Sequence, residues 1–143
     1  MADVRPVLDQ VNLVVNDMDA SLAFYRRLGV EFPNMTPEWD AHHRSAKTEG
    51  DLDFDLDSAR FAQDWNEGSR GPAVVVGFKL PSRDAVDALY AELTGAGYRG
   101  QQPPWDAFWG SRYAIVEDPD GNAVGIMSPV DAALRSDPPS PAP

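Results

Sequence analysis

Cysteine is absent from this sequence of 143 residues. Its absence excludes disulfide bonds, thiolate nucleophiles, and zinc or iron–sulfur sites built on cysteine, and it fits a reducing compartment. Long apolar runs are also missing, so no segment is expected to cross a membrane, and the amino terminus lacks the charged and then apolar layout of a signal peptide. We therefore expect a cytoplasmic protein whose length suits a single domain.

Basic residues are few. The sequence has 12 Lys and Arg and 23 Asp and Glu, which gives a formal net charge of −11. A field of this sign repels the phosphates of nucleic acids and of anionic membrane surfaces, so neither is expected as a partner. An acidic surface keeps a protein in solution, and the same field also attracts cationic small molecules. The charge therefore favours a small-molecule partner over a nucleic acid or a membrane.

The chain repeats one pattern at an offset of 65 positions. Residues 11–29 and residues 74–97 each begin with an apolar strand and continue into an amphipathic helix, and the two segments superpose without a gap. Asp17 and Ser82 stand at the expected N-caps, and glycine ends both helices. The repeat predicts two structurally similar halves.

Short strand-like segments follow each helix. In the first half they are GVEFP, AHHRSAKT and DLDFDLD, and in the second they lie around GYRG, SRYAIVED and NAVGIMS. These patterns predict an α+β fold in which two βαβββ repeats, about residues 8–57 and 73–129, form a curved mixed sheet with a cleft. Residues 1–136 are predicted to be one domain, with a linker that begins as a partial helix at 58–72 and a disordered, proline-rich tail at 137–143.

Two segments carry a resemblance to a known family. DQVNLVVNDMDASLAFYRRLG and WGSRYAIVEDPDGNAVGIMSP, together with the internal repeat, resemble the vicinal oxygen chelate superfamily of glyoxalase I, extradiol dioxygenases and bleomycin-resistance proteins. The resemblance covers about residues 8–129. It implies a homodimer whose clefts are built across the subunits.

Enzymes of that superfamily hold a divalent metal with one ligand from the first strand and one from the last strand of each half. By resemblance these positions fall on Gln10, Val75, Gly125 and one of Asp53 and Asp55. Valine and glycine have no ligand side chain, so neither a metal nor another cofactor is expected here.

Histidine occurs only as the adjacent pair His42 and His43. Adjacent residues of a strand point to opposite faces, so at most one of the two enters the cleft. That histidine, combined with Asp53 or Asp55, leaves a rearranged metal site open as an alternative. No grouping of serine, histidine and acid is legible in the sequence, and no glycine-rich phosphate cradle is present.

Aromatic residues gather in PPWDAFWGSRY, and such rings fill a core, form a subunit interface or clasp a ligand. The segment WGSRYAIVEDPDGN resembles the drug-binding branch of the superfamily, closest to mitomycin-resistance proteins. There a tryptophan and a histidine sandwich a planar drug, and these roles map onto Trp109 and His43. DLDFDLD is far more acidic than its counterpart in that branch, so a different cargo is expected.

A polar floor is expected beside these rings. If the apolar residues of 51–57 pack under a helix, Asp53 and Asp55 face the cleft near Gln10 and Asn12, which suits a ligand with amino or amide donors. Gly125 is expected to leave room for a flat ligand over its strand. The full set of predicted ligand-binding residues is Trp109, His43, Gln10, Asn12, Trp39, Asp53, Asp55, Trp105, Phe108, Tyr113, Gly125 and Met127.

Three functions remain open from the sequence. The first is a metal-independent binding protein for a planar, cationic small molecule such as an antibiotic, without catalytic activity. The second is a metal-dependent lyase, isomerase or dioxygenase with a rearranged site. The third is a metal-free catalyst or accessory protein of a biosynthetic pathway in which Asp53 or Asp55 acts as a base.

Overall fold

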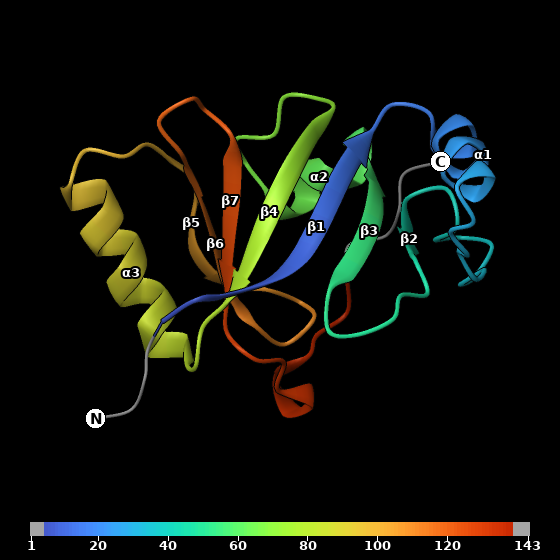
Figure 1. The fold of residues 1–143 in the computed structure, drawn as a ribbon. Helices are drawn as coiled ribbons and strands as arrows, with labels where there is room; N and C mark the ends of the chain where they lie inside the picture. The colour runs from blue at the N-terminus through green and yellow to red at the C-terminus, as the bar shows by residue number, and fades with distance from the viewer. Residues whose placement is uncertain (1–4, 139–143) are drawn as a thin grey trace.

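A computed structural model describes residues 5–138. In it, two central β-strands join the two halves of the chain. β1 and β4 pair antiparallel in the middle of a curved seven-stranded sheet with the order β2-β3-β1-β4-β7-β6-β5 (Figure 1). The strands are β1 (Val7–Val15), β2 (His43–Ser45), β3 (Asp53–Ser58), β4 (Ala73–Lys79), β5 (Gly100–Asp106), β6 (Arg112–Glu117) and β7 (Ala123–Met127). The helices are α1 (Met18–Arg27), α2 (Ala59–Trp65), α3 (Arg83–Gly95) and the short 3-10 helix η1 (Ala132–Leu134). The predicted α+β fold is confirmed.

Both long helices begin at the predicted caps. The side chain of Asp17 accepts a hydrogen bond from the backbone of Ala20, and Ser82 accepts one from Ala85. After α3, Gly97 takes a φ of +101°, a conformation that L side chains rarely adopt, so the chain can turn towards β5. Local sequence signals therefore set both helix starts.

The first half has one strand fewer than predicted. GVEFP forms an isolated bridge between Glu31 and Lys47 in place of a strand. Pro33 has no N–H to donate to a sheet, and the buried guanidinium of Arg44 donates to the carbonyl oxygen of Phe32. A side chain therefore satisfies backbone groups that a neighbouring strand would otherwise pair.

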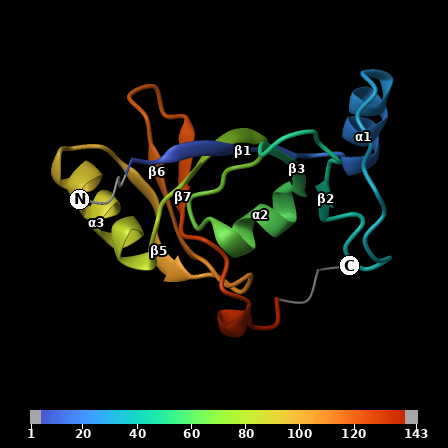
Figure 2. The same ribbon diagram turned by 60° about the horizontal axis from the view of Figure 1, so that its bottom comes forward.

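Helices lie on both faces of the sheet. α1 packs on the first half through Met18 and Leu22, and α3 packs on the second half through Val86. Figure 2 shows α2 on the opposite face, where Phe61 and Trp65 belong to a separate core cluster. The segment predicted to be a linker therefore begins with a helix that fills part of the hollow of the sheet.

Alternation along the strands separates the core clusters. In β6, Tyr113 and Ile115 face α2, whereas Ala114 between them faces α3. Within residues 5–138, no helix combines the length and the hydrophobicity needed to span a bilayer. The predicted cytoplasmic location stays a prediction.

Candidate functional site

A cavity of about 370 Å³ lies on the face of the sheet that carries α2. Its volume is in the range of small-molecule sites. The lining residues come from both halves of the chain and from α2: Gln10, Asn12, Met35, Trp39, His43, Asp55, Asp57, Phe61, Trp65, Phe108, Trp109, Tyr113, Met127 and Pro138. One chain supplies all of these residues, and the predicted homodimer stays a prediction.

One wall of the cavity is polar and acidic. β1 and β3 run parallel, and amide side chains of β1 reach carboxylates that lie two residues beyond their Cα partners on β3. The amide nitrogen of Gln10 donates to Asp55 Oδ2 over 2.6 Å, and that of Asn12 donates to Asp57 Oδ2 over 3.0 Å. Both carboxylates are buried. Their hydrogen bonds offset part of the cost of burying charge.

His43 extends this wall from β2. Its Nδ1 is hydrogen-bonded to Asp57 Oδ1, and its Nε2 lies 3.3 Å from Ser45 Oγ. Burial lowers the pKa of His43, but the hydrogen bond and charge of Asp57 together with the charge of Asp55 outweigh this effect and raise it. Burial also raises the pKa of Asp55, although hydrogen bonds from Ser45 and Gln10 oppose that change. The structure thus joins a serine, a histidine and an acid that the sequence left unconnected.

The contact between His43 and Asp57 is expected to make stability depend on pH. Because the folded pKa of His43 is raised from 6.5, the contribution is fully present below the unfolded value and is lost as pH rises through the higher folded value. Urea unfolding of the wild type and of His43→Asn near pH 6 and near pH 9 measures this. The stability advantage of the wild type should shrink at the higher pH, and an advantage that grows with pH would contradict it.

Aromatic rings form the other wall. The ring of His43 contacts Phe61, Phe61 contacts Phe108, and Phe108 contacts Trp109, with centroid separations of 6.1, 6.1 and 5.1 Å. The indole N–H of Trp109 donates to the sulfur of Met127 over 3.2 Å. These contacts connect the polar wall to the far side of the cavity through a continuous row of rings.

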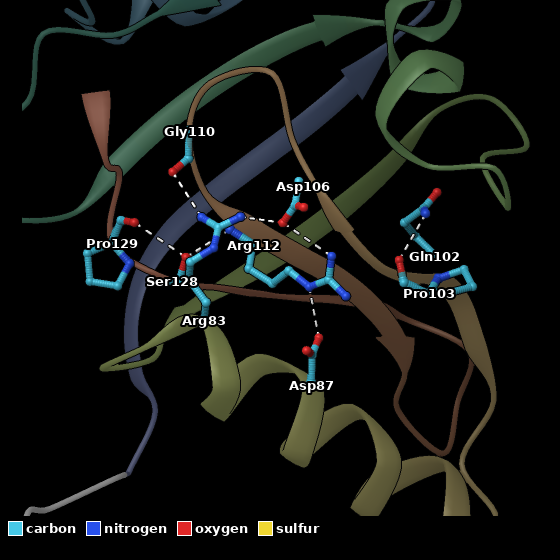
Figure 3. Close-up of polar contacts among 9 residues, drawn as sticks. All are labelled: Arg83, Asp87, Gln102, Pro103, Asp106, Gly110, Arg112, Ser128 and Pro129. Atoms are coloured by element: carbon cyan, nitrogen blue, oxygen red, sulfur yellow. Dashed lines mark hydrogen bonds and ion pairs between the residues drawn. The ribbon is translucent and has the colours of Figure 1, made fainter. Parts of the chain in front are cut away.

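An ion-pair network supports the loop that carries Phe108 and Trp109 (Figure 3). Arg112 bridges Asp87 and Asp106, with nitrogen–oxygen distances of 2.9 and 3.2 Å. Arg83, at the start of α3, pairs with Asp106 and donates to the carbonyl oxygen of Gly110 over 3.3 Å. The network ties both ends of the loop to α3, although each exposed pair contributes little by itself.

Tyr113 occupies the space that Gly125 leaves. A Cβ atom added to Gly125 would lie 2.8 Å from the Tyr113 hydroxyl oxygen, and Tyr113 is buried. Burial and the charge of nearby Asp57 raise the pKa of this phenol, so it stays neutral. The expectation that a ligand lies directly over Gly125 is therefore wrong, because the protein fills that place with its own ring.

The cost of crowding Gly125 can be measured. Gly125→Ala is expected to lower the free energy of unfolding by about 1–3 kcal/mol, because the new methyl group overlaps Tyr113. In a Tyr113→Phe background the nearest contact is gone, so the same change should cost less. Urea unfolding of the four proteins gives the coupling energy. Equal costs in both backgrounds would contradict the contact.

The positions that the resemblance assigns to metal ligands do not fit a metal. Val75 is buried in the core, Gly125 lies under Tyr113, and the amide of Gln10 is engaged by Asp55. Among residues 5–138, no three His, Asp or Glu side chains are grouped so that they could hold an ion. His43, the first residue of β2, lines the cavity, and His42, which lies in the turn before β2, does not.

Most of the predicted ligand-binding residues line the cavity, and their role in binding stays a prediction. They are Trp109, His43, Gln10, Asn12, Trp39, Asp55, Phe108, Tyr113 and Met127. Three others do not line it. Asp53 is exposed at the start of β3, Trp105 packs behind Phe108 and Trp109, and Gly125 is covered.

Five lining residues were missed. Asp57 follows Asp55 by two positions, so alternation along the strand was a sufficient signal. Phe61 and Trp65 stand four residues apart on one face of α2, but only the docking of α2 on the sheet brings them to the cavity. Met35 and Pro138 lie in segments without such a pattern.

The last residues that the structure describes lie beside the site. The backbone N–H of Ser136 donates to the carbonyl oxygen of Phe108 over 3.0 Å, and Pro138 lines the cavity. Most of the predicted disordered tail, residues 139–143, lies outside the described residues, so its disorder stays a prediction.

Comparisons with known proteins agree on the fold. Residues 7–126 match the model of the Glyoxalase/Bleomycin resistance protein/Dioxygenase superfamily. No curated protein matches the sequence. The Mn(II)-bound glyoxalase from Novosphingobium aromaticivorans is similar at 23% identity and a TM-score of 0.62, over 96% of this chain and 43% of that one.

Two further structures resemble the chain over most of their own length. Methylmalonyl-CoA epimerase from Mycobacterium tuberculosis is 19% identical with a TM-score of 0.58, over 93% of this chain and 95% of that one. A superfamily member from Vibrio splendidus 12B01 is 17% identical with a TM-score of 0.57, over 89% and 100%. The family model spans most of the sequence, and the solved structures share the fold of this chain. The chain therefore belongs to the glyoxalase/bleomycin resistance protein/dioxygenase superfamily.

Proposed function

We propose that the protein is a metal-independent binding protein that holds a planar, cationic small molecule, such as an antibiotic, for drug sequestration. The observation that carries this proposal is a cavity with a continuous aromatic row, from Phe61 to Trp109, opposite an acidic wall. A flat ring stacked on an aromatic side chain gains about 0.5–1.5 kcal/mol beyond area burial. The pocket therefore suits a ligand that is held by ring contact.

The charges of the acidic wall favour a cation. Asp57 has His43 as a partner, whereas Asp55 accepts hydrogen bonds from neutral groups only. Asn12 Oδ1 is buried without a partner among the described residues, and it is an acceptor that suits an N–H donor. A positive charge over the rings would add about 0.5–2 kcal/mol. A planar aromatic amine satisfies both walls together.

The likeness to mitomycin- and bleomycin-resistance proteins supports the antibiotic as the ligand class. Trp109 and His43, the two positions that correspond to the drug sandwich, both line the cavity. We expect a homodimer from the same likeness, and sedimentation of the purified protein measures it. Sequestration by binding alone also agrees with the finding that the residues at the family's metal-ligand positions do not fit a metal.

Fluorescence titration tests the proposal. Three planar probes of different charge, proflavine, phenazine and anthraquinone-2-sulfonate, are titrated against protein purified with EDTA and against protein with added Mn(II). We expect saturable tryptophan quenching, tightest for the cation proflavine, with the same affinity in both preparations. Quenching that needs the metal, or no saturable quenching by any probe, would overturn the proposal.

A further inference from the structure

We propose that the cavity also contains a metal-free general base, in which His43, oriented by Asp57, takes a proton from a planar carbon acid that lies against the aromatic row. This inference goes beyond ligand binding, because it adds a reaction. It rests on the proposed function for the placement of the substrate. The reaction uses only side chains of the protein.

Asp57 holds the imidazole in one orientation. The carboxylate is 3% exposed and accepts hydrogen bonds from His43 Nδ1 and from the Asn12 amide. Because Asn12 donates to Oδ2 and His43 bonds to Oδ1, both oxygens of the carboxylate are engaged. A proton kept on Nδ1 by the carboxylate leaves the lone pair of neutral histidine on Nε2. Asp57 is thus a positioning residue, and His43 is the base.

His43 Nε2 is available to a substrate. The side chain of His43 is 26% exposed and lines the cavity, so it is reachable without unfolding. The polar contact of Nε2 is the Ser45 hydroxyl at 3.3 Å, which is longer than a strong hydrogen bond. A substrate C–H can therefore replace this weak contact, while Asp57 keeps the ring in place.

Asp55 lies beside the base. It is buried at the cavity and accepts a hydrogen bond from Gln10, and Ser45 lies between Asp55 and His43. As a carboxylate, Asp55 stabilises the imidazolium that forms when His43 takes a proton.

The reaction class follows from these roles. The substrate's C–H bond next to a carbonyl breaks, its proton moves to His43 Nε2, and its electron pair forms an enolate. Return of the proton from His43 to another carbon of the enolate forms a new C–H bond and completes an isomerisation without an oxidant, a reductant or a metal.

A planar carbon acid with a coloured product tests the base directly. With 5-nitrobenzisoxazole, removal of the C3 proton forms the nitrile as the N–O bond breaks, and 2-cyano-4-nitrophenolate is released. We expect protein purified with EDTA to catalyse this elimination with saturation once the pH exceeds the raised pKa of His43, at a rate at least ~100-fold above an equal concentration of free imidazole. His43→Ala should lower the rate at least tenfold, and added imidazole should restore part of it.

The adjacent histidine supplies the matched control. His42→Ala removes the same side chain outside the cavity and should change the rate less than twofold. Failure of the wild type to turn over the probe, or an undiminished rate in His43→Ala, would overturn the general base. If proflavine still quenches the tryptophans in that case, the proposed binding function stands. If proflavine fails to bind while elimination depends on His43, the binding function fails and the base remains.

Discussion

Replacement of Trp109 with alanine is expected to weaken proflavine binding about thirtyfold, which corresponds to ~2 kcal/mol. The indole lines the cavity, and it contacts the rings of Phe108 and Tyr113 with centroid separations of 5.1 and 5.2 Å. Its hydrogen bond to the Met127 sulfur holds the ring in place. Alanine removes both the stacking surface and the area that a ligand would bury. Isothermal titration calorimetry measures the change without relying on tryptophan emission.

The matched control is the neighbouring tryptophan. Trp105 meets Trp109 edge to face at 5.8 Å but does not line the cavity. Trp105→Phe keeps an aromatic edge beside Trp109, so its affinity should stay within threefold of the wild type. Equal losses for the two variants would mean that the ligand does not lie against Trp109.

Leu56→Ala is expected to lower the free energy of unfolding by about 3 kcal/mol. Leu56 is fully buried at the centre of β3 and packs with Met18 and Leu22 of α1. The smaller side chain leaves a cavity between the sheet and the helix, on the face opposite the binding site. Urea unfolding followed by circular dichroism measures the loss.

A second leucine in the same stretch provides the comparison. Leu52 precedes β3 and is 44% exposed, so Leu52→Ala should cost less than about 0.5 kcal/mol. Binding of proflavine by folded Leu56→Ala should remain, because the substitution lies on the face away from Asp55 and Asp57. Similar losses of stability for both leucines would contradict the observed burial.

The fold was predictable because its signals are local or repeated. Asp17 and Ser82 cap the two long helices, and the offset of 65 positions indicated two related halves. The missing strand at GVEFP was not predictable in this way. It depends on the buried Arg44 reaching back to Phe32, and that contact joins residues twelve positions apart.

The site was predictable where one strand determines it. Alternation placed Asp55 on the cavity side, and the same rule extends to Asp57. Phe61 reaches the site through the docking of α2, and Tyr113 covers Gly125 through the pairing of β6 with β7. Such contacts depend on how distant elements pack, and no single segment encodes them.

A crystal structure of EDTA-treated protein soaked with proflavine tests the proposed binding most directly. We predict density for the flat ligand against Trp109, with an amino group near Asp55 and no ion bonded to protein side chains in the cavity. A coordinated metal ion in that cavity, or a ligand bound away from Trp109 and His43, would contradict binding by ring contact.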